Sequence, residues 1–167
     1  MECFLLLVWC ENYIENYIML DEFEPCQQIK PCLYLGSASA LRCDIDFSMV
    51  VNCTIDIPFS KKYKNSIRVP VHDDLFYNDQ FLEIMENTDI LSKIHALVLD
   101  HKPVLVHCYA GIQRSCSVVA CYLIRYYDMT LLDAVEYIRK FRPCAFSEEV
   151  VFMTAMETFR RNLDLYS

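Results

Sequence analysis

A cysteine and an arginine separated by five residues occur in the stretch "VLVHCYAGIQRSCSVV", residues 104–119. A free thiol is only about 3% ionised at pH 7, so a nucleophilic cysteine needs hydrogen-bond donors around its sulfur. The free amides and the dipole of a helix that begins near Arg114 would stabilise a thiolate at Cys108. The planar guanidinium of Arg114 matches two oxygens of a phosphate. Together these residues predict attack of the Cys108 sulfur on phosphorus, with a cysteinyl-phosphate intermediate.

The turn between these two residues contains Gly111, one of only two glycines in the chain. A turn whose successive amides point inward needs a residue without a Cβ, which Gly111 supplies. Ser115, in the first turn of the following helix, is placed to donate a hydrogen bond to the sulfur when it leaves phosphorus. The predicted phosphate loop consists of Cys108, Tyr109, Ala110, Gly111, Ile112, Gln113 and Arg114.

Alternating apolar runs and helical patterns surround this loop. Short apolar or β-branched runs predict strands, and steps of three and four between apolar residues predict helices. The expected fold is a single α/β domain with a mostly parallel central sheet flanked by helices. In such sheets ligands bind beyond the carboxyl ends of the strands, where the loop would lie. The expected strands are 32–36, 49–54, 67–71 and 104–108; the expected helices are 79–100, 114–127, 131–142 with Thr130 as N-cap, and 148–162 with Ser147 as N-cap.

The first 24 residues are predicted to form a separate amphipathic helical segment that precedes a domain at 25–167. Residues 4–20 space their apolar side chains in helical steps and contain the tetrad "ENYI" twice. This helix either packs on its own domain or pairs two copies of the chain as a homodimer.

Composition excludes several classes of function. The formal net charge is −8 and the pI is near 4.9, which argues against broad binding to nucleic acid or to an acidic membrane surface. Eight consecutive apolar residues near the N-terminus fall short of the roughly 20 that span a bilayer. The ten cysteines occur largely inside apolar runs, and no secretory signal is evident. We therefore expect a reduced, intracellular protein, cytoplasmic or also nuclear. No C-x2-C or H-x3-H pair indicates a metal site, and no cofactor is expected.

A cysteine or an arginine seen alone is usually structural, but the pattern HCxxGxxRS specifies five positions at once. The stretch "VHCYAGIQRS" resembles the signature of cysteine-dependent protein tyrosine phosphatases, and "AGIxRS" is most similar to their dual-specificity branch. The resemblance covers about 27–163 and includes "KPCLYLGSASA" and "CYLIRYYDMTLLDAVEYIRKFRP". It implies Cys108 as the nucleophile, Arg114 as the binder of phosphate and transition state, and His107 as a brace of the loop.

The resemblance also suggests the source of a proton for the leaving group, which general acid catalysis requires. The segment "VPVHDDLFYN" is similar to the acid loop of the family, which places the acid at Asp73, with Asp74 as the alternative. Two adjacent aspartates are otherwise typical of a solvated turn.

One departure from the family concerns an asparagine that braces the phosphate loop. Here the corresponding run is "RPCAFSEEVVF", with no asparagine. Either Ser147 or Glu148 substitutes for it, or the loop is held less firmly. A further hypothesis concerns Cys53, which ends the strand expected beside the central one. Cys53 is either a core cysteine or a partner that traps oxidised Cys108 as a disulfide.

The loop side chains between Cys108 and Arg114 carry no charge. Relatives that act on phosphoinositides place lysines there, so phosphorylated proteins are the expected substrates, both as phosphotyrosine and as phosphoserine or phosphothreonine. The alternatives are a phosphatase for phosphoinositides or RNA 5′-phosphates, and a phosphate-binding pseudophosphatase that recognises phosphoproteins without turnover.

Overall fold

The structure is a computed structural model that describes residues 24–147 and 149–165. The expected helix at 4–20, its homodimer contact and the boundary near residue 24 therefore lie outside the described residues. The elements are β1 (Cys26–Lys30), β2 (Leu33–Gly36), η1 (Ala38–Arg42), β3 (Met49–Asn52), β4 (Ser66–Arg68), η2 (Leu75–Tyr77), α2 (Asn78–Asn87), α3 (Ile90–Leu99), β5 (Val104–His107), α4 (Arg114–Tyr127), α5 (Leu131–Phe141) and α6 (Met153–Leu165).

The five strands form one sheet in the order β1-β2-β5-β3-β4. The strand β5 lies in the centre, parallel to both β2 and β3, and β4 is parallel to β3; only β1 is antiparallel. All four residues of β3 and of β5 are buried, as expected for parallel strands covered on both faces. The expected α/β fold with a mostly parallel sheet is confirmed.

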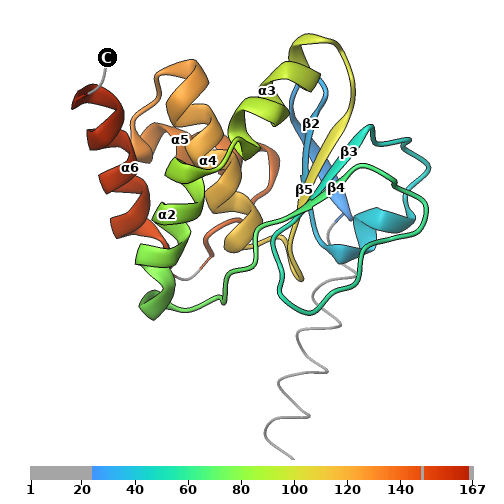
Figure 1. Cartoon of the computed structure of the whole chain (residues 1–167), viewed down its shortest axis with the longest axis horizontal. Helices are drawn as coiled ribbons and strands as arrows, with labels where there is room; N and C mark the ends of the chain where they lie inside the picture. The colour runs from blue at the N-terminus through green and yellow to red at the C-terminus, as the bar shows by residue number, and fades with distance from the viewer. Residues whose placement is uncertain (1–23, 148, 166–167) are drawn as a thin grey trace, which may run out of the picture.

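The two faces of the sheet are covered differently. In Figure 1 the helices α2, α4, α5 and α6 lie together on one side of the sheet, while η1 and irregular segments lie on the other. The larger hydrophobic core lies on the helical side, where Val104 and Val106 of β5 pack against buried residues of α4. Leu105 points to the opposite face and packs with Phe47 and Tyr63 in a smaller cluster. The helix α4 has ten consecutive buried residues, 115–124, so the loop before it is anchored to the centre of the core.

Three expected elements need correction, and one strand is additional. The expected strand at 67–71 is only Ser66–Arg68, since Pro70 has no amide hydrogen with which to continue the strand pairing. The strand β1 was not expected, because in "CQQIK" only Ile29 is buried and an edge strand carries little hydrophobic pattern. The expected helix at 79–100 is two helices, because Thr88 has an extended backbone and its hydroxyl binds the Ile84 carbonyl oxygen at 2.7 Å. The last helix begins at Met153, so the expectation of Ser147 as its N-cap was wrong. The N-cap Thr130 is confirmed, since its hydroxyl accepts the Asp133 amide at 3.1 Å.

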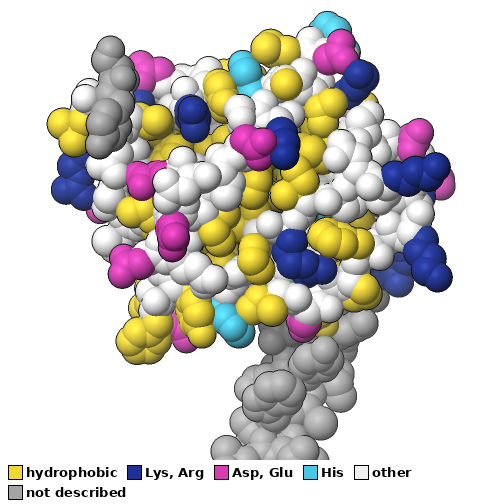
Figure 2. Space-filling model, in the orientation of Figure 1, with side chains coloured by type: hydrophobic (Ala, Val, Ile, Leu, Met, Phe, Trp, Pro, Cys, Tyr) yellow, Lys and Arg dark blue, Asp and Glu magenta, His cyan; other side chains and the backbone are white. Residues whose placement is uncertain are grey.

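Acidic and basic side chains both occur over the helical side and over the sheet side of the face shown in Figure 2, with apolar side chains exposed between them. Within the described part of the chain, no helix is long and apolar enough to cross a membrane.

Candidate active site

The phosphate loop connects the carboxyl end of β5 to the first residue of α4, as the sequence predicts. The strand ends at His107 and the helix begins at Arg114, so the whole turn lies between two buried elements. Gly111 has a φ of +71°, the left-handed conformation that glycine adopts without strain. A Cβ at this position would lie 2.7 Å from the carbonyl carbon and oxygen of Gly36. The only two glycines of the chain therefore meet at one backbone contact.

The sulfur of Cys108 lies inside this curl. The side chain is 1% exposed, and its Sγ accepts hydrogen bonds from the Gly111 amide at 3.2 Å and from the Ser115 hydroxyl at 3.3 Å. Donors of this kind favour the negatively charged form of a sulfur. The structure thus brings Cys108, Gly111 and Ser115 together as the sequence predicts.

The carbonyl groups of the loop are bound from outside. The Tyr109 oxygen accepts the Ala38 amide at 3.0 Å, and the Ile112 oxygen accepts the Phe146 amide at 2.9 Å. The Gln113 oxygen accepts the amide and the hydroxyl of Ser117. Because the N–H and C=O groups of a trans peptide point in opposite directions, outward carbonyls turn the following amides towards the interior of the loop.

The carbonyls of Ala110 and Gly111 are bound by Arg142. Its Nη2 donates to the Ala110 oxygen at 2.9 Å and its Nε donates to the Gly111 oxygen at 2.7 Å. The Cys116 thiol also donates to the Gly111 oxygen, at 3.3 Å. We did not single out Arg142 from the sequence, because a basic residue at the end of a helix is ordinarily explained by the helix dipole. The "RP" pair quoted in the family resemblance was the available signal.

Asp73 lies next to the guanidinium of Arg114. Its Oδ2 is 3.3 Å from the Arg114 Nε, with the two side chains 36% and 15% exposed. Burial raises the pKa of the Asp73 carboxyl above its ordinary value, and the positive charge of Arg114 opposes this rise. Asp74 is exposed and its carboxylate instead accepts the Phe76 amide at 2.9 Å, as the N-cap of η2. The geometry therefore favours Asp73 over Asp74 as the acid.

His107 is fully buried at the end of β5. Its Nδ1 is 3.1 Å from the carbonyl oxygen of Cys108, and burial lowers the pKa of the imidazole. A neutral ring with its proton on Nδ1 donates to this carbonyl and so orients the first peptide of the loop.

The side chain of Gln113 ties the phosphate loop to the segment that precedes α6. Its Nε2 donates to the Glu149 oxygen at 2.5 Å, and its Oε1 accepts the Val151 amide at 3.4 Å. This side chain is 8% exposed, so it faces the protein rather than a bound substrate. Ser147 is exposed and Glu148 lies outside the described residues.

Two further thiols lie near Cys108. Cys53 and Cys116 are fully buried, and for each of them burial and the nearby sulfur of Cys108 raise the pKa of the thiol. The Cys53 amide donates to the His107 carbonyl at 2.7 Å, which confirms its place beside the end of β5. The structure leaves a disulfide with Cys108 as a hypothesis.

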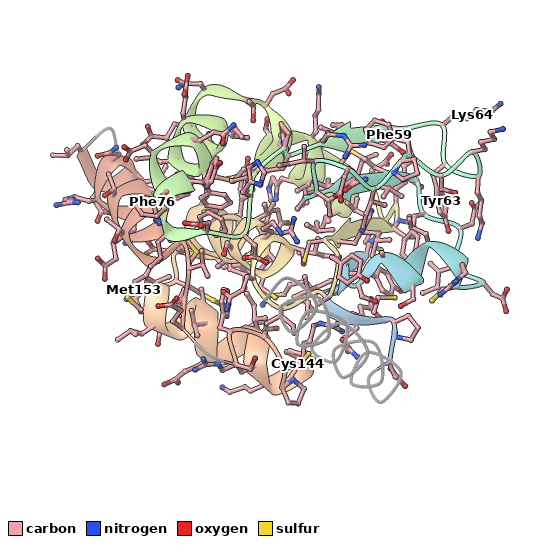
Figure 3. The ribbon with its side chains drawn as sticks, turned by 90° about the horizontal axis from the view of Figure 1, so that it is seen from below. Phe59, Tyr63, Lys64, Phe76, Cys144 and Met153 are labelled. Carbon is pink, nitrogen blue, oxygen red and sulfur yellow. The ribbon has the colours of Figure 1, made fainter. Side chains whose placement is uncertain are left out.

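Exposed apolar side chains lie on both sides of the face that carries the loop. The carboxyl end of β5 points to the lower side of Figure 1, and Figure 3 views the molecule from that side. Phe76 and Met153 lie on the helical side of this view and Phe59 on the sheet side. Phe76 is 92% exposed, which makes it available to a bound chain. Within residues 24–147 and 149–165 no group of three or more metal-ligating side chains is found.

A thiol surrounded by amide donors, with an arginine and a carboxyl beside it, is the arrangement that attack of sulfur on a phosphate ester requires. The chain belongs to the dual specificity phosphatase family: residues 33–162 match the description "Dual specificity phosphatase, catalytic domain".

Individual relatives agree with this assignment. Mouse dual specificity protein phosphatase 14 is 31% identical over 122 residues, which cover 70% of this chain and 60% of that protein. The crystal structure of human DUSP28 superimposes with a TM-score of 0.74 at 25% identity, covering 85% of this chain and 97% of that one. Phosphatidylglycerophosphate phosphatase PTPMT2 of Arabidopsis thaliana is 28% identical over 132 residues, covering 79% of this chain and 55% of that protein. The chain thus spans 60% or less of the length of these two curated relatives.

Proposed function

We propose that this chain is a cysteine-dependent protein phosphatase that hydrolyses phosphotyrosine and phosphoserine or phosphothreonine esters. The observation that carries the proposal is the environment of Cys108, whose Sγ accepts the Gly111 amide and the Ser115 hydroxyl while Arg114 opens the adjacent helix. A dianionic phosphate is stabilised at such a helix N-terminus by the dipole and by amides already turned towards it.

The first chemical step transfers the phosphoryl group to sulfur. The Cys108 thiolate forms the S–P bond as the P–O bond to the leaving group breaks, with the sulfur and the leaving oxygen on opposite sides of phosphorus. The Asp73 carboxyl gives its proton to the leaving oxygen. Burial raises the pKa of the Asp73 carboxyl, which favours its protonated form, while the nearby guanidinium of Arg114 opposes this rise; a bound phosphate that engages Arg114 would weaken that opposition.

The second step releases inorganic phosphate. The Asp73 carboxylate accepts a proton from water as the water oxygen bonds to phosphorus, and the S–P bond breaks with its electron pair returning to sulfur. The Ser115 hydroxyl, 3.3 Å from Sγ, donates to the thiolate as it leaves. Asp73 then carries a proton again, taken from water, and the sulfur has regained its electron pair, while the first proton has left with the alcohol and the water oxygen with the phosphate.

The choice of substrate follows from the side chains around the loop. Tyr109, Ala110 and Ile112 bring no positive charge to meet further phosphates, and Gln113 is turned away. Exposed Phe76 and Phe59 on either side of this face suit the apolar or aromatic side chains of a peptide rather than a polyphosphorylated headgroup. A phosphopeptide is therefore the favoured ligand.

The test compares the wild type with Cys108→Ser and Arg114→Lys on p-nitrophenyl phosphate. We expect loss of turnover in Cys108→Ser, and retention of the [32P]phosphoryl group on Cys108 after rapid acid quenching of the wild type. Activity that survives in Cys108→Ser would contradict the assignment of the nucleophile. A wild type that binds vanadate but never releases nitrophenol would indicate the phosphate-binding pseudophosphatase instead.

A second assay decides the substrate class. Phosphotyrosine and phosphoserine peptides, phosphatidylglycerophosphate, a phosphoinositide and an RNA 5′-triphosphate are compared by kcat/KM. We expect the peptides to exceed the others. The name of the Arabidopsis relative makes a lipid phosphate the serious alternative, and a preference for it would overturn the proposed substrate while leaving the chemistry intact.

A further inference from the structure

The loop's carbonyl groups are held in part by a buried arginine whose charge has no carboxylate partner. Arg142 is 1% exposed, and among the described residues no ion pair involves it. Its hydrogen bonds go to neutral oxygens: the carbonyls of Ala110 and Gly111, the carbonyl of Glu24 at 3.2 Å, and the side-chain oxygen of Gln27. A buried charge without a counter-ion is costly. In this low-dielectric environment the guanidinium polarises the peptide groups that it binds.

The peptide unit between Ala110 and Gly111 connects this charge to the reactive sulfur. At one end its carbonyl oxygen accepts Arg142 Nη2 at 2.9 Å; at the other its N–H donates to Cys108 Sγ at 3.2 Å. The guanidinium and the sulfur thus bind opposite ends of one planar peptide. A cation at the oxygen polarises the amide and strengthens its N–H as a donor. The second hydrogen bond, from Arg142 Nε to the Gly111 oxygen, likewise holds the carbonyl of the next peptide outward and so turns the Ile112 N–H towards the interior of the loop.

We infer that Arg142 is a positioning residue of the proposed phosphatase, which stabilises the Cys108 thiolate and bound phosphate through the peptides 110–112. It touches neither sulfur nor substrate and acts through the loop. The inference rests on the proposed function for its consequence in turnover, but its central claim concerns the ionisation of one thiol and is measurable without substrate.

The experiment measures alkylation of Cys108 by iodoacetamide, with the modified peptide quantified by mass spectrometry to separate it from the other cysteines. At about pH 6 the rate follows the fraction of thiolate, and at about pH 9 most thiols are ionised, so the ratio of the two rates reports the stabilisation of the thiolate. We expect Arg142→Ala to lower this ratio about tenfold, since removing a nearby positive charge and its hydrogen bonds disfavours the negatively charged sulfur. Binding of inorganic vanadate should weaken in parallel.

Two readouts separate this role from a merely structural one. Arg142→Lys keeps the charge but not the spread of donors, so its ratio should lie between those of the wild type and Arg142→Ala. Millimolar guanidinium chloride should restore the ratio in Arg142→Ala, whereas equimolar sodium chloride should not. The control is Arg160→Ala: among the described residues Arg160 pairs with the carboxylates of Asp128 and Asp164, and it contacts neither the phosphate loop nor the segment at 145–146 that binds the loop.

Gln27→Leu provides the test if Arg142→Ala does not fold. Gln27 holds the outer nitrogen of Arg142, so its loss should lower the ratio in the same direction by a smaller factor. A wild-type ratio in folded Arg142→Ala, or in both Arg142→Lys and Gln27→Leu, would overturn the inference, as would an equal loss in Arg160→Ala. If the wild type hydrolyses no phosphate ester but the ratio still depends on Arg142, the proposed function fails and this inference stands.

Discussion

Replacing Gly111 with alanine tests the curl of the phosphate loop directly. The position has a φ of +71°, and a residue with a Cβ loses roughly 1–2 kcal/mol in this conformation. The added Cβ would also lie 2.6 Å from Arg142 Nη2 and 2.7 Å from the Gly36 carbonyl group. Backbone cannot yield as a flexible side chain can, so overpacking adds about 1–3 kcal/mol. The sum predicts a loss of about 2–5 kcal/mol in the free energy of unfolding.

The assay combines urea unfolding with vanadate binding and kcat/KM on p-nitrophenyl phosphate, measured well below the unfolding transition. Because the added Cβ displaces the peptides that face Cys108, we expect Gly111→Ala to weaken vanadate binding by more than tenfold even where the protein is folded.

Gly36→Ala is the matched control. Its Cβ would crowd the Pro25 carbonyl oxygen and lie 2.7 Å from the Cys26 Cβ, but its φ is not positive. We therefore expect only the overpacking cost, about 1–3 kcal/mol, and a smaller effect on vanadate. Unchanged unfolding and activity in Gly111→Ala would mean that the loop does not adopt this curl in solution.

Other substitutions test single contacts. Asp73→Asn should lower kcat about 100-fold or more while vanadate still binds. Because burial raises the Asp73 pKa, the alkaline fall in wild-type activity should occur as pH rises through that raised value, and the variant should lack this alkaline fall. Gln113→Ala should lower the free energy of unfolding by about 1–3 kcal/mol because it leaves the buried Val151 amide unpaired, as thermal unfolding against Gln80→Ala would show. Ser115→Ala should slow breakdown of the cysteinyl-phosphate, seen as a burst of nitrophenol followed by a slower steady state; the absence of a burst would contradict the role of Ser115. Peroxide treatment followed by thiol mapping should find Cys53 joined to Cys108, and no such peptide would end the redox hypothesis.

The sequence predicted the parts of this structure whose causes are local. The pattern of α4 gives its bounds, and Thr130 caps α5 through a hydroxyl bond to an amide three residues away. The order of Cys108, Gly111 and Arg114 was sufficient to predict the loop. Each of these depends on residues within one turn or one strand.

The contacts that the sequence did not reveal join distant segments. Arg142 reaches the phosphate loop from the end of α5 and meets Gln27 of β1, 115 residues earlier in the chain. In the sequence Gln113 is an ordinary polar loop residue, and only the folded structure shows that it binds the segment before α6. Long-range pairs of this kind have no periodicity, so only the folded arrangement identifies them.

The meeting of Gly36 and Gly111 has a consequence for how such a domain changes over time. Two positions 75 residues apart share one contact of bare main chain, and neither has room for even a methyl group. A change at one cannot be relieved by trimming the other, because nothing smaller exists. We therefore expect both positions to remain glycine in descendants of this sequence, while the surrounding cysteines and aromatic residues can be substituted.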